Sequence, residues 1–234
     1  MSLINDLREN LNAVGERIKH SAQKVGRDPT EVTLVAVSKT YGSGVLRAAI
    51  EAGATDLGEN KVQEAETKIA ELGRAAARWH LIGNLQANKA RKAVRLFDLI
   101  HSLDSIDLAM RLERLCREEN RARLDVLVQV DLAGEATKSG VTEQDLPALI
   151  EVLQKCVHLK LRGLMILPPF FGEAERVRPF FRRLRELRDT LAAQNVFGPE
   201  RGELSMGMSG DFEVAIEEGA TIVRVGTAIF GKRN

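Results

Sequence analysis

The stretch that decides the fold is TLVAVSK, residues 33–39, an apolar and β-branched run that ends in a serine and a lysine. Its apolar residues do not alternate with polar ones, which is typical of a parallel strand covered on both faces. The helical pattern VLRAAIEAG follows at residues 45–53 and ends in glycine, a frequent helix terminator. Residues 33–53 therefore predict one strand followed by one helix.

The same unit recurs along the chain. A helix is predicted after Thr142, further strands at residues 54–60, 77–85, 96–104, 124–132, 159–167, 203–209 and 221–231, and further helices at 61–73, 86–95, 108–120, 178–193 and 212–219. Strict alternation implies parallel pairing through right-handed crossovers. Eight units predict an α/β fold of the closed (β/α)8, or TIM barrel, type. An open doubly wound sheet is the alternative, but it usually has fewer strands, and no GxGxxG follows the first strand.

An amphipathic helix precedes the first strand. Apolar residues recur at steps of three and four between Leu3 and Ala22, and the pattern ends near Gly26. Residues 1–26 therefore predict an N-terminal helical extension. Since no linker or shift in composition divides the chain, residues 1–234 are expected to form a single domain.

Composition narrows the partners and the location. The 34 basic and 33 acidic residues give a formal charge of +1, which offers no whole-chain attraction for nucleic acid or an anionic membrane. No apolar run approaches the length of a membrane span, and charges within the first ten residues argue against a signal peptide. Cys116 and Cys156 lack nearby cysteine or histidine partners, so we expect reduced thiols and no metal site. The expectation is a soluble, cytoplasmic protein.

Active sites in such barrels lie at the carboxyl ends of the strands. Lys39 ends the first strand, where it either marks the exit of the chain into solvent or is used chemically. Other polar residues at predicted strand ends are Glu59, Asn60, Asn84, His101, Ser102, Asp131, Ser209 and Thr227. These residues are expected to meet on one rim.

Two short glycine motifs occur where barrels often bind phosphate, after the last two strands. Ser209-Gly210 and Gly226-Thr227 combine backbone amides with hydroxyls. Each motif alone could be a tight turn, but together they favour phosphate binding. Lys39, expected across the barrel mouth, could form a Schiff base with an aldehyde. Pyridoxal 5′-phosphate (PLP) provides both an aldehyde and a phosphate.

Other residues leave alternatives open. Arg224 shares the face of Gly226, so it could reach the ring nitrogen of PLP, or it could form a structural ion pair within the barrel. His80 and His101 are more typical of hydrogen-bonded core histidines than of catalytic ones. Met165 and Met206 fit either the cofactor pocket or the core.

Nearly the whole chain resembles the YggS/PROSC family, the pyridoxal phosphate homeostasis proteins. The motifs that carry the resemblance are VAVSKT, LGENKVQE, WHLIGNLQANK, HSLD, VQVDLAGEATKSGV, GLM and SMGMSGDFEVAIEEGATIVRVGTAIFG. Two positions depart from the family pattern, because Asp131 stands where asparagine is expected and Lys61 where an aromatic residue is common.

The resemblance implies a fold similar to the N-terminal barrel of alanine racemase, a fold-type III PLP enzyme. It implies a PLP aldimine at Lys39 and cofactor contacts from Asn60, Met208, Ser209, Arg224, Gly226 and Thr227. It also implies a carrier or regulator in vitamin B6 balance, without an established reaction, whose partners would be PLP and PLP-dependent apo-enzymes.

Two enzymatic functions are the alternatives. An amino-acid racemase needs a base on each face of the substrate, and alanine racemase takes its second base from a second domain of the partner subunit. No such domain is expected after Gly226, and Tyr41 lies too close to Lys39 in sequence to serve the opposite face. The other alternative is a lyase that uses Lys39 directly on a sugar phosphate. Without a second domain, a monomer is expected.

Overall fold

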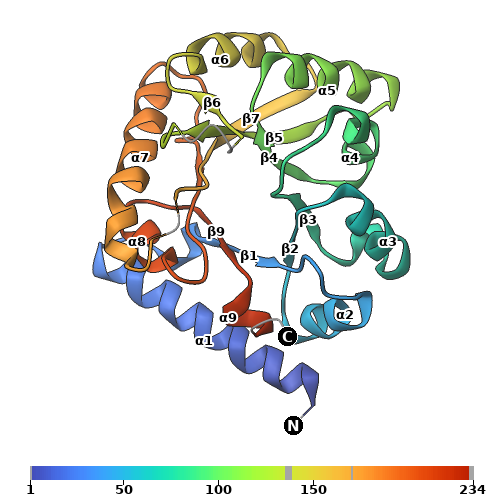
Figure 1. Cartoon of the computed structure of the whole chain (residues 1–234), viewed down its shortest axis with the longest axis vertical. Coiled ribbons are helices and arrows are strands. Elements are labelled where there is room, and N and C mark those ends of the chain that lie inside the picture. The colour runs from blue at the N-terminus through green and yellow to red at the C-terminus, as the bar shows by residue number, and fades with distance from the viewer. Residues whose placement is uncertain (1, 135–138, 170, 232–234) are drawn as a thin grey trace.

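The computed structural model describes residues 2–134, 139–169 and 171–231. Strands and helices alternate around a ring (Figure 1). The strands are β1 (Thr33–Val37), β2 (Asp56–Glu59), β3 (Arg78–Leu81), β4 (Leu99–Leu103), β5 (Leu124–Asp131), β6 (Val141–Thr142), β7 (Leu159–Met165), β8 (Glu203–Ser205) and β9 (Ile222–Val225). The helices are α1 (Leu3–Lys24), α2 (Ser43–Ala52), α3 (Val62–Leu72), α4 (Ala90–Leu96), α5 (Ile106–Glu118), α6 (Leu146–Lys155), α7 (Arg178–Ala193), α8 (Phe212–Glu217) and α9 (Thr227–Phe230).

The strands close into a barrel. The hydrogen-bonded order is β4-β3-β2-β1-β9-β8-β7-β5, and β4 also pairs with β5, so that the ring has no free edge. The strand pairs are parallel, with β1 joined to both β2 and β9. The two-residue strand β6 pairs with β5 outside the ring. The predicted TIM barrel is confirmed, and the open doubly wound sheet is wrong.

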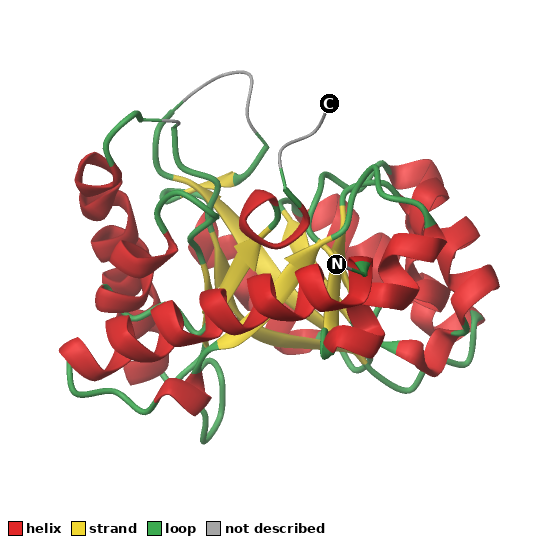
Figure 2. Ribbon diagram, turned by 90° about the horizontal axis from the view of Figure 1, so that it is seen from below, coloured by secondary structure: helices red, strands yellow, loops and turns green. Residues whose placement is uncertain are grey.

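Two layers of apolar side chains hold the barrel together. Inside the ring, Val35, Leu99, Leu127, Met165 and Ile222 form one buried cluster. A larger cluster fills the space between the strands and the surrounding helices, which cover the barrel in Figure 2. This two-sided burial explains why the strands read as continuous apolar runs.

The predicted N-terminal helix is confirmed as α1, and it forms part of the barrel wall. It packs against α2, α8 and α9, as Figure 1 shows along the lower side of the ring. Leu7, Val14 and Ile18 are buried on its inner face. On its outer side, Arg17 Nε donates to Glu213 Oε1 at 2.8 Å. The extension therefore helps to cover the first and last strands.

Some boundaries differ from the prediction. The strand expected at residues 203–209 ends at Ser205, because Gly207 has a φ of +93° and turns the chain. The strand expected at residues 221–231 ends at Val225, and the short helix α9 follows it. Both changes shorten the strands and leave residues 206–211 as a loop, and Gly226 as the link to α9, at the barrel end.

The two cysteines, Cys116 and Cys156, are free thiols whose pKa values depend on burial. Burial raises the pKa of Cys116 and of Cys156 to about 11. Within residues 2–134, 139–169 and 171–231, no helix combines the length and apolar composition needed to cross a bilayer. The same described residues contain no group of three or more histidine, cysteine or acidic side chains placed to hold a metal ion.

Candidate functional site

A cavity of about 650 Å³ opens at the carboxyl ends of the strands. Segments that follow β1, β2, β3, β7, β8 and β9 line it. Its volume falls within the roughly 300–1,000 Å³ that is usual for small-molecule sites. The cavity walls include all seven residues expected to contact a cofactor, namely Lys39, Asn60, Met208, Ser209, Arg224, Gly226 and Thr227.

Lys39 follows β1 and reaches this cavity because side chains alternate along a strand. Val37, two residues earlier, also lines the cavity. Ser38 points to the opposite side of the sheet, where its Oγ donates to Glu59 Oε1 at 2.6 Å. The alternation therefore separates a cavity-facing lysine from a serine anchored behind it.

Lys39 lies beside the loop after β9. Since β1 and β9 are hydrogen-bonded neighbours, Ala36 stands opposite Val225, and Lys39 and Gly226 follow close behind. The expectation that Lys39 lies across the mouth from both glycine loops is wrong for this one. The physical reason is closure, which makes the first and last strands of the ring adjacent.

A buried ionic cluster lies behind Lys39, between β2 and α3. We call Ser38, Glu59, Glu64 and Lys68 the Lys68 cluster. Lys68 Nζ donates to Ser38 O at 2.8 Å and to Glu59 Oε1 and Glu64 Oε1 at 2.7 Å each, which uses its three donors. Burial raises the pKa of Glu59, opposed by the hydrogen bonds from Lys68 and Ser38. Glu59, expected on the rim, therefore faces α3.

The Lys68 cluster also holds Thr40, the residue that follows Lys39. The Thr40 φ of +72° is a true outlier for a β-branched residue. The Thr40 backbone N–H donates to Glu64 Oε1. Burial acts to raise the pKa of Glu64, but the bonds from Lys68 and from this N–H bring it below its usual value. The Lys68 cluster thus holds the backbone immediately before and after Lys39.

Asn60 and Asn84 form the wall next to Lys39. Gly83 makes this possible, because a Cβ at that position would come within 2.4 Å of the Asn60 carbonyl oxygen. The Asn84 side chain donates to Ser139 Oγ at 2.7 Å. The predicted contact residue Asn60 is therefore placed by a close approach of two loops, which only glycine at position 83 permits.

Ser209 connects the two glycine loops. Its Oγ accepts from the backbone N–H of Gly226 at 3.1 Å and of Ala228 at 3.4 Å. Because both of these bonds use the oxygen as an acceptor, the hydroxyl proton of Ser209 can be donated elsewhere. In the same loop, the Met208 N–H donates to Asp211 Oδ1 at 2.6 Å. The two motifs predicted to bind phosphate are therefore joined to each other by hydrogen bonds through Ser209.

Arg224 is buried in the cavity floor, with 3% of its surface exposed. It donates to Ser205 Oγ at 2.5 Å and to the Ile166 carbonyl at 2.8 Å. Burial lowers its pKa to about 10, partly offset by the charge of Asp211. Among the residues that the structure describes, these hydrogen-bond partners are neutral, so the structural ion pair is not the arrangement found.

Several other expected rim residues do not line the cavity. His101 and Ser102 are buried, and Ser102 Oγ donates to the Gly83 carbonyl at 2.7 Å. Asp131 Oδ1 accepts from the N–H groups of Ala133 and Gly134, each at 3.0 Å, and so shapes its own loop. The middle of the motif VQVDLAGEATKSGV lies outside the described residues.

Sequence reasoning missed the apolar wall of the cavity. Leu167, Pro169, Phe171, Ala174 and Val177 contribute it from the segment between β7 and α7. The only sequence signal was Pro168-Pro169, which predicted the end of a strand but not the path of the chain afterwards. Met165 and Met206, considered for the pocket, are fully buried in the core.

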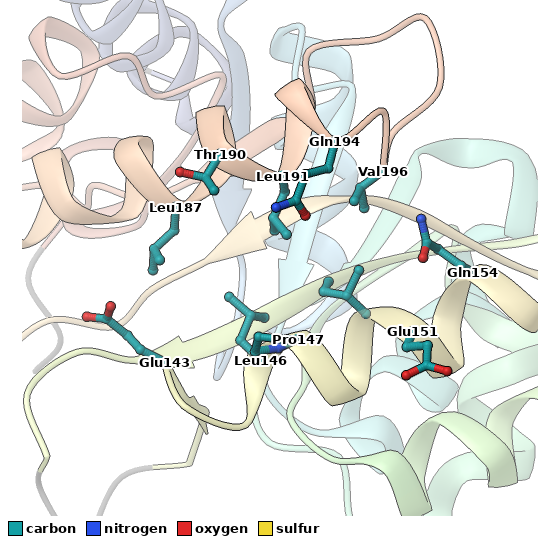
Figure 3. A pocket seen from close by; sticks show the side chains of 11 residues that line it. Glu143, Leu146, Pro147, Glu151, Gln154, Leu187, Thr190, Leu191, Gln194 and Val196 are labelled. Carbon is teal, nitrogen blue, oxygen red and sulfur yellow. The ribbon is translucent and has the colours of Figure 1, made fainter.

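A second hollow, of about 330 Å³, lies on the outer wall of the barrel (Figure 3). It runs between α6 and α7, where Leu146, Ile150, Leu187 and Leu191 line it together with polar residues such as Gln194. None of the seven predicted site residues contributes to it. Of these two, only the cavity at the strand ends therefore contains the predicted site residues.

Comparison with known proteins reveals full-length relatives. Residues 10–234 match the family described as "Alanine racemase, N-terminal domain". A protein of Pseudomonas aeruginosa named pyridoxal phosphate homeostasis protein is 45% identical over 231 residues, which cover 99% of this chain and 97% of that one. A protein of the same name from Aquifex aeolicus is 44% identical, with 96% and 97% covered.

The structure of PipY from Synechococcus elongatus with PLP bound is also similar. It superimposes with a TM-score of 0.83 at 39% identity and covers 96% of this chain and 100% of PipY. These alignments cover both the barrel and its N-terminal helix. The chain therefore belongs to the alanine racemase N-terminal domain family, among the pyridoxal phosphate homeostasis proteins.

Proposed function

We propose that this protein binds PLP reversibly in intracellular PLP (vitamin B6) homeostasis and holds it as a Schiff base on Lys39. The observation that carries the proposal is the convergence of Lys39, Arg224 and two hydrogen-bonded glycine motifs on one cavity. The names of the full-length relatives and the PLP bound to PipY support it.

The donors in the cavity fit the groups of PLP. Bound PLP supplies an aldehyde and an electron-withdrawing ring. Lys39 offers an amine for the aldehyde, and Ser209 and Thr227 offer hydroxyls for the phosphate. At Gly210 an added Cβ would meet no atom within 4 Å, so the loop backbone borders open space. Arg224 is a permanent donor for the ring nitrogen and would keep that nitrogen unprotonated.

The surroundings of Tyr41 argue for holding PLP rather than for racemisation. Its hydroxyl donates to the Gly231 carbonyl at 3.2 Å, and its ring stacks on Phe230 at 4.9 Å between centroids. Tyr41 is not among the residues that line the cavity. This placement supports slow or no turnover, with amino-acid racemisation as the alternative function.

We extend the proposal to the setting of the protein. Residues 1–234 form a single domain that acts as a cytoplasmic monomer and supplies PLP to PLP-dependent apo-enzymes. Neither nucleic acid nor a membrane is a partner, in line with the formal charge of +1. Light scattering tests the monomer, and reactivation of a PLP-dependent apo-enzyme by the loaded protein tests the transfer.

Borohydride trapping tests the central proposal. Purified protein supplied with PLP should turn yellow, and reduction should fix a pyridoxyl group on Lys39, as peptide mass spectrometry would show. Lys39→Ala should lose this adduct, because the nearby amine of Lys68 is bonded to Ser38, Glu59 and Glu64 and does not line the cavity. Lys61→Ala, which removes an exposed lysine near the same rim, should keep it. A reducible adduct that survives in Lys39→Ala would sink the assignment.

Amino-acid turnover separates the two functions. The absorbance spectrum should be recorded before and after adding alanine and several other amino acids, with chiral analysis of each. Slow spectral change without inversion supports a PLP-binding role. Robust inversion at a catalytic rate would establish the racemase instead.

A further inference from the structure

A chain of hydrogen-bonded side chains crosses the barrel interior and ends at the cavity. Asp56 Oδ1 lies 2.8 Å from His80 Nε2, and His80 Nδ1 lies 2.9 Å from His101 Nε2. His101 Nδ1 lies 2.8 Å from Ser205 Oγ, which is 2.5 Å from Arg224 Nη1. We call these five residues the polar chain. It joins β2, β3, β4, β8 and β9, and its first residue begins β2, at the opposite end of the barrel from the cavity.

With Asp56 ionised and both imidazoles neutral, the donors and acceptors of the polar chain can be ordered in only one direction. The Asp56 carboxylate only accepts, so His80 carries its proton on Nε2 and accepts at Nδ1. His101 must then carry its proton on Nε2 and donate to His80 Nδ1. His101 Nδ1 therefore accepts the hydroxyl proton of Ser205, whose oxygen accepts from Arg224. Both imidazoles thus carry their proton on Nε2.

Burial and charge agree with this order. His80 and His101 are fully buried, and burial lowers the pKa of both, to well below the usual value for His101. Burial also acts to raise the pKa of Asp56, but its bonds from His80 and Thr55 bring it below the usual value. The chain therefore has an anion at one end, two neutral rings and a cation at the other end.

Three further charged groups act on the ends of the polar chain. Arg78 lies 3.9 Å from Asp56 Oδ1, and the charge of Asp98 also acts on His80. Asp211 acts on Arg224 from the loop after β8. Arg78 partly neutralises Asp56 without interrupting the chain, because Asp56 still accepts from His80.

We propose that the polar chain is a positioning device for the bound cofactor. Asp56, His80, His101 and Ser205 act as positioning residues, which fix the guanidinium of Arg224 in the cavity floor and transmit the negative charge of Asp56 to it. This role rests on the proposed binding of PLP. It deepens that proposal because it places control of the cofactor ring at the far end of the barrel.

Two conservative variants test the role. Ser205→Ala removes one of the two acceptors of Arg224, and we expect roughly tenfold weaker PLP binding, the usual effect of losing a hydrogen bond to a charged group. Asp56→Asn keeps an oxygen acceptor but removes the charge. The cavity then becomes more positive, so the pH midpoint of the yellow absorbance band, which reports protonation of the Lys39 nitrogen, should fall by roughly half a unit.

Matched controls separate positioning from general stability. Ser205→Thr keeps the hydroxyl and should bind PLP as the wild type does. Asp125→Asn removes a partly buried carboxylate from the beginning of β5, outside the polar chain, and should leave the midpoint unchanged. The role is overturned if Ser205→Ala binds PLP as tightly as the wild type, if Asp56→Asn keeps the wild-type midpoint, or if Asp125→Asn shifts it equally.

Nuclear magnetic resonance tests the order of protons without any cofactor. The chain has four histidines, so nitrogen-15 signals of PLP-free protein can be assigned with single variants. His80 and His101 should be neutral and protonated on Nε2 at pH 7. An imidazolium or the other tautomer at either residue overturns the polar chain. Wild-type protein that stays colourless with PLP overturns the proposed function and the positioning role with it, whereas failure of the variants in yellow protein overturns the role alone.

Discussion

At the scale of single residues, Thr40 shows how strain serves the site. A positive φ costs a β-branched residue on the order of 1–3 kcal/mol, yet Thr40 adopts +72° directly after Lys39. Glu64 stabilises this conformation by accepting the Thr40 N–H, and Lys68 fixes Glu64 in turn. The strained residue therefore sets the direction in which Lys39 leaves β1.

Thr40→Gly tests that interpretation. Glycine adopts positive φ without strain but loses more entropy on folding, so the free energy of unfolding should change by less than about 1 kcal/mol. PLP binding should nevertheless weaken several-fold, because the backbone after Lys39 becomes less restricted. Equilibrium titration of the yellow band measures this.

The control for Thr40→Gly is Asn120→Gly. Asn120 also has a positive φ, of +53°, but it follows α5, away from the cavity. Its replacement should leave PLP affinity unchanged. Unaltered affinity in both variants would show that the conformation of Thr40 has no role in the site.

The hydroxyls of Ser209 and Thr227 form a second residue-scale test. Removing both in Ser209→Ala/Thr227→Ala should weaken PLP binding by roughly tenfold, since hydroxyl donors are lost while backbone amides remain. Ser209→Ala also releases the Gly226 N–H that its Oγ accepts. Thr190→Ala, on the exposed face of α7, is the control. Wild-type affinity in the double variant would exclude these side chains from phosphate binding.

At the scale of elements, helix α1 is part of the packed structure and not only an N-terminal extension. Its buried face covers the outside of the barrel where the first and last strands meet, beside the short helices α8 and α9. We infer that α1 completes the barrel wall.

Truncation of Leu7 measures this contribution. Leu7 is 3% exposed, so Leu7→Ala should lower the free energy of unfolding by about 2–4 kcal/mol through lost burial and a residual cavity. Leu3→Ala, at a position that is 50% exposed in the same helix, should change it by less than about 0.5 kcal/mol. Urea unfolding compares the two. Equal effects would mean that α1 is not part of the core.

The helices and strands were predictable from sequence wherever burial imposes a pattern of apolar residues. Runs such as residues 124–132 revealed strands covered on both faces, and the strand-end rule placed Lys39 and Thr227 on the same rim. It misplaced Glu59, since the rule identifies the end of a strand but not which side of the sheet a residue faces. The turn at Gly207 also escaped prediction, because it depends on a close approach to Ala215 and Phe212, where a Cβ at position 207 would come within 2.8 Å of either residue.

At the scale of the whole molecule, two neutral histidines in the core make stability depend on pH. In the unfolded chain they take up protons near pH 6.5, whereas burial keeps their folded pKa values lower. Below pH 6.5 the unfolded state therefore binds more protons, and the free energy of unfolding falls as the pH falls. Glu59 and Asp211, whose pKa values burial raises, act in the opposite direction and reduce this loss.

Urea unfolding between pH 7.5 and 5.5 checks the sign. Each histidine contributes up to about 1.4 kcal/mol per pH unit below 6.5, so we expect a loss of roughly 2–3 kcal/mol before the opposing carboxylates are counted. His20→Gln, which replaces an exposed histidine on α1, should show the same dependence. Stability that stays constant or rises toward pH 5.5 would contradict neutral, buried histidines.

The site as a whole was predictable only in part. The seven expected contact residues line one cavity because a barrel gathers its strand ends, which topology alone dictates. The polar chain was not predictable, since its members come from five strands and are joined by distances that sequence does not encode. The Lys68 cluster was not predicted either, because a lysine within a helix normally indicates an exposed position.

The pairing of β1 with β9 has a consequence for synthesis. Lys39 belongs to an early part of the chain, whereas Arg224, Gly226 and Thr227 come from a late one. A growing chain on the ribosome therefore exposes Lys39 long before the strand that completes its surroundings has emerged. The cavity proposed to bind PLP is therefore complete only once β9 has docked, at the end of synthesis.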